Sequence, residues 1–306
     1  MLATLALYSD RLFMAAVGVY VLSMLLHGGE YALLRSARPV LVGAGSEPVD
    51  DPEPDAGPRS RPDRLGRMGV ALLVLGAGLQ LGSIVARGLA AGRWPLGNMY
   101  EFTSAICLAA VVAWLIVLRR WAGARPAGLF LLLPVVVLLF LAGTVLYAQA
   151  APVMPALQSY WLVVHVTTVA LASGLFFVPG VASLLYLLRR SGRLDEFAER
   201  LPSAASLDRL AYRTTIIAFP LYTFAVIAGA IWAEAAWGRF WGWDPKETVA
   251  FVAWVVYAAY LHARATAGWR TGRAAWINVA GFAAIIFNLF FINMVVAGLH
   301  SYAGLD

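Results

Sequence analysis

The sequence predicts an all-α, polytopic integral membrane protein with about eight transmembrane helices. Hydrophobic residues make up 61% of the 306 residues and charged residues only 13%, a balance far from that of soluble domains. Long apolar runs recur along the chain, each close to the ~20 residues that cross a bilayer core. A run of this length in lipid must be helical, because exposed backbone groups find no water partners there.

The apolar runs are separated by short polar or charged segments. We expect helices at about 12–34, 68–90, 102–118, 127–148, 160–188, 214–234, 247–263 and 275–298. The first run is not a removable signal peptide, because it is too long and no small-residue cleavage pattern follows it. The only cysteine, Cys107, lies inside the third run, where a buried thiol is expected to fill space rather than react.

The chain is expected to form a single membrane domain over residues 1–306. A first helix (1–35) is joined to a core (68–306) by the segment 36–67, whose Gly, Pro and alternating charges predict a flexible cytoplasmic connector. In residues 193–210, charged residues alternate with spaced Leu and Phe, which predicts a short surface helix.

Basic residues are divided unevenly between the two sets of connecting segments. Segments 35–67, 119–126, 189–213 and 264–274 hold 18 of the 23 Lys and Arg residues. The positive-inside rule puts these segments in the cytoplasm and both termini outside it. The net charge of +6 therefore reflects membrane topology, and nucleic acid is not an expected partner.

The segment between the sixth and seventh runs is the most unusual part of the chain. It contains a cluster of tryptophans, Trp232, Trp237, Trp241 and Trp243, followed by Asp244, Lys246 and Glu247. A flat aromatic surface edged with charges suits a large planar ligand with carboxylates, such as haem. An interfacial aromatic belt is the ordinary alternative, but it accounts for one or two tryptophans more easily than for a dense cluster.

The charged residues of this segment have different expected roles. Arg239 and Lys246 are placed to pair with haem propionates, and Lys246 is the only lysine in the chain. Asp244 and Glu247 are expected to fix the turn and cap the next helix, since helix N-termini favour acidic residues.

The four histidines divide into an outer pair and an inner pair. His165 and His300 are expected near the outer surface, and His262 and His27 near the inner one. Two imidazoles from facing helices supply both axial positions of a haem iron. The alternative for each is an ordinary hydrogen-bonded residue of a helix bundle, but ionisable residues inside membranes are costly and mark functional sites. We expect up to two bis-histidine sites for haem b.

Residues 231–248 resemble the tryptophan-rich WWD motif of haem-handling proteins. Together with Leu-His-Ala-Arg at 261–264 and Gly-Leu-His-Ser-Tyr at 298–302, they resemble the CcsA family of system II cytochrome c biogenesis, also called ResC. Residues 93–102 are similar to the external loop that precedes the third span in this family. The resemblance covers about 68–306.

The resemblance implies a holocytochrome c synthase (haem lyase) of the bacterial cytoplasmic membrane that acts with a CcsB (ResB) partner subunit. Haem would cross the membrane to the external WWD segment and be joined by thioether bonds to apocytochrome c bearing Cys-x-x-Cys-His. Thiol reductant proteins would act indirectly.

The resemblance also implies roles for individual residues. His165 and His300 would be the external haem ligands, and His262 an intramembrane ligand whose partner is His27 or a residue of the other subunit. The cofactor-binding surface would comprise Trp232, Trp237, Arg239, Trp241, Trp243, Asp244, Lys246 and Arg93.

Two other functions remain open from the sequence. The first is a haem exporter or chaperone without ligation activity, which would use the same tryptophan-rich surface. The second is a membrane cytochrome b that transfers electrons between two haems. A cytochrome b normally carries its paired histidines on the same helices, whereas each histidine here lies on a separate run.

Overall fold

The computed structural model of the chain describes residues 2–34, 60–153, 158–192, 198–266, 268–269 and 272–300. Within these residues, every regular element is a helix, and eight helical segments are long and apolar enough to cross a membrane. The predicted all-α polytopic class is therefore confirmed. Residues 36–59 of the predicted connector (36–67) and residues 193–197 of the predicted surface helix lie outside the described part. Residues 61–67 of the predicted connector belong to a membrane helix instead.

The helices extend beyond the apolar windows that predict them, because polar residues cap them. Ser60, Asn98, Ser159 and Ser203 each accept a hydrogen bond from a backbone N–H in the first turn of the helix that follows. As a result, residues 204–210 belong to a membrane helix and not to the predicted surface helix. The elements are α1 (Leu2–Leu33), α2 (Arg61–Ala91), α3 (Met99–Arg120), η1 (Ala122–Ala127), α4 (Gly128–Thr144), α5 (Tyr160–Arg190), α7 (Ala204–Trp237), α8 (Pro245–Thr266), α9 (Gly272–Phe287), the π-helical turn η3 (Asn288–Ile292) and α10 (Asn293–Val295).

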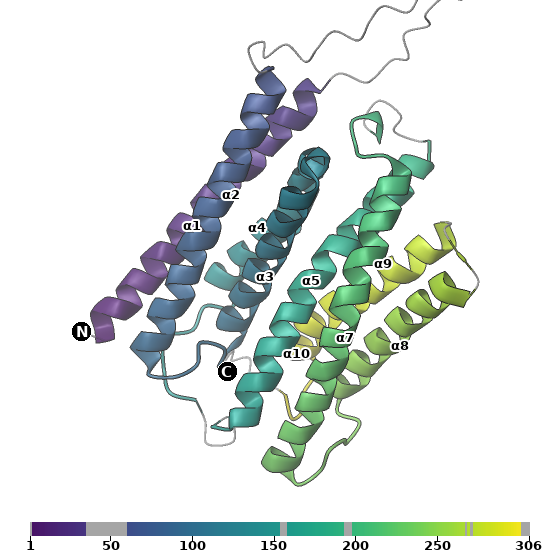
Figure 1. Ribbon diagram of the computed structural model, residues 1–306. Helices are drawn as coiled ribbons and strands as arrows, with labels where there is room; N and C mark the ends of the chain where they lie inside the picture. The colour runs from purple at the N-terminus through teal and green to yellow at the C-terminus, as the bar shows by residue number, and fades with distance from the viewer. Residues whose placement is uncertain are drawn as a thin grey trace, which may run out of the picture.

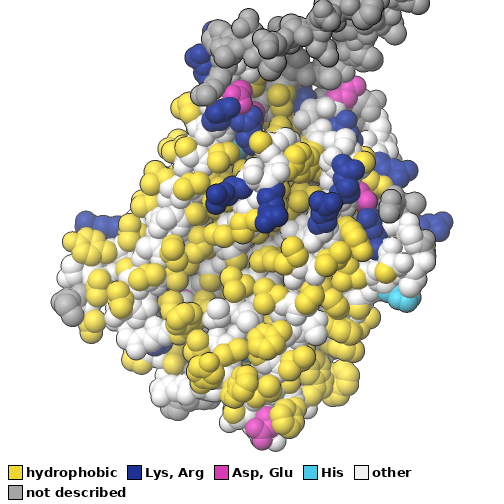
Figure 2. Space-filling view, viewed as in Figure 1, with side chains coloured by type: hydrophobic (Ala, Val, Ile, Leu, Met, Phe, Trp, Pro, Cys, Tyr) yellow, Lys and Arg dark blue, Asp and Glu magenta, His cyan; other side chains and the backbone are white. Residues whose placement is uncertain are grey.

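The bundle has two sides that meet at α3 and α5 (Figure 1). Helices α1 and α2 pack as a pair, with α4 against α1, on one side. Helices α7, α8 and α9 lie on the other side, and α7 packs along α5. The start of α1 and the α7–α8 connection lie at the same end of the molecule (Figure 1). Apolar side chains cover most of the face seen in Figure 2. On this face, most Lys and Arg side chains lie toward the end of the molecule opposite the α7–α8 connection.

The contact between the two sides depends on a glycine in α5. A Cβ built on Gly174 would lie 2.5 Å from Cβ of Ala109 and 2.6 Å from the carbonyl oxygen of Ile106, both on α3. Two helices approach this closely only where a side chain is missing from their interface. Cys107 is fully buried beside this contact, as expected for a packing residue.

We predict that Gly174→Ala destabilises the protein, because the added methyl group would displace the α3 backbone. Overpacking of this kind costs roughly 1–3 kcal/mol. Thermal unfolding in detergent micelles would measure the change. Gly78→Ala in α2 is the matched control, since a Cβ there meets nothing within 4 Å. The control should be neutral or slightly stabilising, and equal unfolding temperatures for the two variants would contradict the prediction.

Candidate functional site

His165 lies in the first turns of α5 and faces α7. Its Nδ1 lies 2.8 Å from the carbonyl oxygen of Ala225. Since a carbonyl can only accept, Nδ1 carries the proton and Nε2 keeps its lone pair. Gly229, one turn further along α7, makes room for the ring, because a Cβ there would lie 2.6 Å from Cε1.

His300 follows α10 and is fixed in the same way by a carboxylate. Its Nδ1 lies 2.8 Å from Oδ2 of Asp244. The other oxygen of Asp244 accepts a 2.8 Å hydrogen bond from the backbone N–H of Leu299. A histidine that donates one ring N–H to a carboxylate and leaves the other nitrogen free has the usual arrangement of a metal ligand.

The surroundings of His300 favour the neutral form of its ring. Burial and the charge of Lys246 lower the pKa of His300 below its usual 6.5, and Asp244 offsets part of that effect. Burial acts to raise the pKa of Asp244, but the hydrogen bonds from Leu299 and His300 hold it below its ordinary value. Asp244 is therefore an anion at neutral pH and fixes the tautomer of His300.

Two tryptophans of the motif pack against both histidines. The ring of Trp232 is nearly parallel to that of His165, with centroids 6.2 Å apart, and lies 5.8 Å from that of His300. Trp237 contacts Trp232 and His300 at centroid distances of 4.7 and 5.0 Å. Trp232 is buried, and its Nε1 has no hydrogen-bond partner within the described residues. The structure thus brings together His165 and His300, the predicted outer pair.

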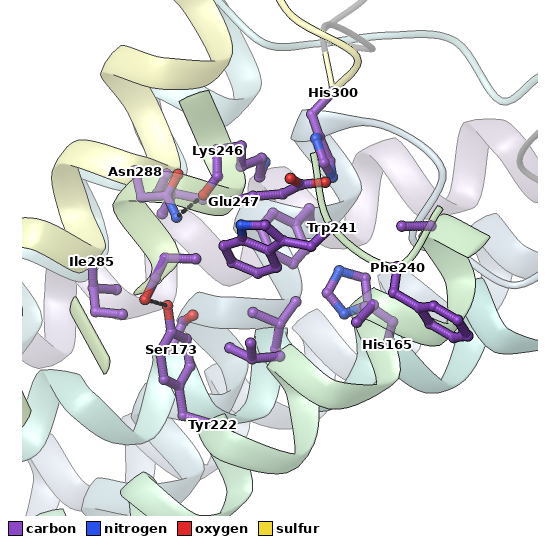
Figure 3. A pocket seen from close by; sticks show the side chains of 18 residues that line it. His165, Ser173, Tyr222, Phe240, Trp241, Lys246, Glu247, Ile285, Asn288 and His300 are labelled. Carbon is purple, nitrogen blue, oxygen red and sulfur yellow. Dashed lines mark hydrogen bonds between the residues drawn. The ribbon is translucent and has the colours of Figure 1, made fainter. Parts of the chain in front are cut away.

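The histidine pair borders two small cavities, one of which is seen in Figure 3. Phe102 and Val169 line both cavities, and Phe240 and Trp241 line one. Each holds about 100 Å³, less than the roughly 300–1,000 Å³ of small-molecule sites. A large planar ligand would therefore enter only if some of the residues that line these cavities moved.

Lys246 is a partly buried cation that faces these cavities (Figure 3). Its Nζ donates to Oδ1 of Asn293, which follows the π-helical turn η3. Among the described residues, no carboxylate lies within ion-pair distance of Nζ. Burying a charge without a counter-charge is costly, so the site favours an anionic group beside Lys246.

The α7–α8 turn is held by Glu247, which accepts hydrogen bonds from the backbone N–H groups of Gly242 (2.9 Å) and Asp244 (3.1 Å). Asp244 in turn accepts one from the N–H of Lys246. The predicted capping role of both acids is confirmed. Arg239 is near the same turn, with Nη1 3.8 Å from Glu247.

Trp243 occupies a different position from the other tryptophans of the motif. Its backbone is left-handed, with φ 58°, and its side chain is 67% exposed. It packs edge-on against Trp241 and Phe251 and is not among the residues that line the two cavities. Trp243 therefore contacts Trp241 but does not reach the cavities beside the histidine pair.

Arg93, expected on the cofactor surface, has a structural role instead. Its Nη1 lies 2.7 Å from Oε2 of Glu101, and its Nε donates to the carbonyl of Ala151 at 2.8 Å. Glu101 also pairs with Arg87 at 3.0 Å. These contacts hold the 93–98 segment against the ends of α2 and α3 and occupy the Arg93 guanidinium, which does not line the two cavities beside the histidines.

The inner pair, His27 and His262, is not brought together. His27 is fully buried in α1, with Nδ1 3.4 Å from Glu30, and Gly69 and Gly128 pack against its ring. His262 is exposed on α8, which packs against α7 and α9 on the other side of the bundle (Figure 1). The expectation that these two residues ligate one haem is wrong for this structure. The alternative, a ligand from another subunit, stays a prediction.

Sequence reasoning missed the residues that position the site. Asn293 was not identified, although an amide inside the last apolar run is a signal of the same kind as an intramembrane histidine. The carbonyl of Ala225 and the ring of Phe102 have no signal in the sequence, since any residue supplies a carbonyl and many apolar residues line a cavity.

Comparisons with known proteins agree on one family. Residues 96–300 match the family described as Cytochrome C assembly protein. The chain is 35% identical to the cytochrome c biogenesis protein CcsA of Parasynechococcus marenigrum, over 76% of this chain and 86% of the relative. It is 34% identical to the CcsA protein of a Synechococcus strain (80% and 86%) and 36% identical to that of Prochlorococcus marinus (72% and 79%).

We predict that His300 titrates below its usual pKa of 6.5 and that Asp244→Asn lowers the pKa further, since Asp244 acts to raise it. The unfolded state then binds more protons than the folded state just below pH 6.5, so this residue makes stability fall as the pH drops through that range. NMR titration of ¹⁵N-imidazole-labelled protein would measure both pKa values, with His300→Gln assigning the resonance. Titration of His300 above pH 6.5 would contradict this account.

Proposed function

The chain belongs to the cytochrome C assembly protein family, and we propose that it holds haem at the extracytoplasmic surface of the membrane for covalent attachment to apocytochrome c. The observation that carries the proposal is the histidine pair around Trp232, in which each ring has Nδ1 bound to an acceptor and Nε2 free. A structural zinc site needs four side chains. Two imidazoles match the two axial positions of a haem iron.

Haem is the substrate in this proposal, and His165 and His300 are its axial ligands. Lys246 pairs with one propionate, because it is a partly buried cation that faces the cavities and has no described carboxylate within ion-pair distance. Arg239 is placed for the other propionate, since its contact with Glu247 is long, at 3.8 Å. The indoles of Trp232, Trp237 and Trp241 supply the apolar face and exclude water.

The attachment step needs little acid–base chemistry from this chain. Each cysteine thiol of the Cys-x-x-Cys-His segment adds across a haem vinyl group. A C–S bond forms and the thiol proton passes to the neighbouring carbon, so no oxidant is required. Catalysis is then mainly positioning of two reactants. The 238–244 segment opens to admit haem, as loops over many active sites do, and the incoming histidine displaces one axial ligand to release the product.

The proposal places the chain in a bacterial cytoplasmic membrane, with the tryptophan-rich segment outside. His262 then lies near the cytoplasmic end of α8, the least buried of the eight spans that the described residues contain. Its exposed face also carries Phe251, Val252 and Val255. We assign this face to a CcsB (ResB) partner subunit, which would supply the second ligand of an inner haem.

We predict that His165→Gly and His300→Gly abolish maturation of a Cys-x-x-Cys-His reporter coexpressed with the chain and its partner subunit. Added imidazole should restore part of the activity by occupying the vacated axial position. Haem staining of the reporter on denaturing gels measures covalent attachment. Leu184→Gly, on the exposed side of α5, is the matched control for His165→Gly, because it carries the same cost of a helical glycine without touching the site. His300 follows α10, so His300→Gly carries no such helical cost.

The same experiment separates a synthase from an exporter. Covalent haem in the reporter requires ligation activity, whereas an exporter alone would deliver haem that washes out under denaturing conditions. Wild-type levels of covalent haem in either histidine variant without imidazole would contradict the proposed ligand pair.

We predict that Lys246→Gln weakens haem retention by the purified protein roughly tenfold or more, the size expected for a lost charge-assisted hydrogen bond. Lys246→Arg is the control, since it keeps the charge but changes its shape, and it should lie between wild type and Lys246→Gln. Spectroscopic titration with haem measures the affinities. Unchanged affinity of Lys246→Gln for haem would show that Lys246 does not bind a propionate.

A further inference from the structure

A second, larger hollow lies on the opposite side of α5 from the histidine pair. It is a groove of about 890 Å³ between α3 and the α5–α7 pair, within the roughly 300–1,000 Å³ of ligand sites. Along α3 it runs from Ala105 to Arg120, about 22 Å of helix. Its walls are mainly aliphatic and include Leu108, Val112, Ile116, Leu171, Leu175 and Ile217.

The two ends of the groove differ in chemistry. At one end, Trp94 closes the groove with a 2.9 Å hydrogen bond from its Nε1 to Oγ1 of Thr167. At the other end, Arg120 from the last turn of α3 meets Arg209 and Arg213 from the start of α7. The groove is therefore an apolar channel with a cationic mouth.

The arginines at the mouth have no acidic partner within the described part of the chain. Among the described residues, no carboxylate lies within ion-pair distance of any of the three, and Arg209 donates only to the hydroxyl of Ser206. Asp208, next to Arg209 in sequence, is paired with Arg264 instead. Figure 2 shows Lys and Arg side chains in a band above a largely apolar face.

We propose that this groove binds one anionic phospholipid, with its phosphate at the arginines and its acyl chains along the aliphatic walls. Guanidinium groups match phosphate oxygens with paired hydrogen bonds. Basic pockets between membrane helices on the cytoplasmic side bind anionic headgroups in this way. Trp121 beside the mouth is suited to the headgroup level of the bilayer.

Haem fits this groove less well than a lipid does. None of the described residues that line it is a His, Cys or Met, so the groove offers none of those iron ligands. Helix α5 also separates it from the cavities beside His165. Leu96 is shared by the groove and one of those cavities, so a bound lipid would support the 93–98 segment without occupying the haem site.

The test uses the full chain purified in detergent and exchanged into phosphatidylglycerol or phosphatidylcholine with identical acyl chains. Native mass spectrometry counts the lipid that remains bound. Wild type should retain phosphatidylglycerol in preference to phosphatidylcholine. The triple variant Arg120→Gln, Arg209→Gln and Arg213→Gln should lose on the order of a hundredfold in affinity for phosphatidylglycerol, from about fivefold per charge.

Two further variants make the result specific. Arg119→Gln removes a neighbouring exposed charge that does not line the groove, and it should bind as wild type does. Ala113→Trp fills the groove without changing any charge, and it should release the lipid. Equal retention of the two lipids by wild type, or unchanged binding in the triple variant or in Ala113→Trp, would overturn the proposal. Displacement of the lipid by haem or by the partner subunit would assign the groove to that occupant instead. None of these outcomes depends on reporter maturation.

Discussion

A histidine ring offers iron only one nitrogen at a time, and the proposed function depends on which nitrogen each outer histidine leaves free. The carbonyl of Ala225 and the carboxylate of Asp244 take the Nδ1 protons of His165 and His300, so both rings present Nε2. Asp244 does more than orient one ring. It also binds the backbone of Leu299 and Lys246, so one carboxylate joins the tryptophan-rich turn, the start of α8 and the segment after α10.

The unsatisfied groups beside the histidines suit a ligand that comes and goes. Lys246 is partly buried with an amide oxygen as its acceptor, and Nε1 of Trp232 is buried with no acceptor among the described residues. Such groups cost stability and are expected where a sequence departs from good packing for the sake of function. In the proposed function haem is bound only transiently, and the small volume of the two cavities agrees with a site that closes after haem has left.

The sequence predicted the eight spans because apolar length is set by bilayer thickness, but it missed their ends because the caps lie outside the apolar windows. It also predicted that His165 and His300 meet, since the tryptophan cluster connects their ends of the membrane. It failed for His27 and His262 because depth along a helix says nothing about lateral position in the bundle. For Arg93 it missed the pairing with Glu101, eight residues away, and the contact with the carbonyl of Ala151, 58 residues away.

Helix α5 is the most buried span among the described residues, and its two faces serve different purposes. His165, Val169 and Ser173 face the histidine cavity, whereas Thr167, Leu171 and Leu175 face the groove. Each set repeats at a spacing of four residues, and a shift of one residue would turn the helix by about 100°. Two glycines oppose such a shift. Gly174 fits α5 against the α3 backbone, and Gly229 on α7 makes room for the ring of His165. These two glycines therefore set the rotation of α5 that points the imidazole of His165 toward the cavity. Apolar periodicity alone does not reveal this rotation.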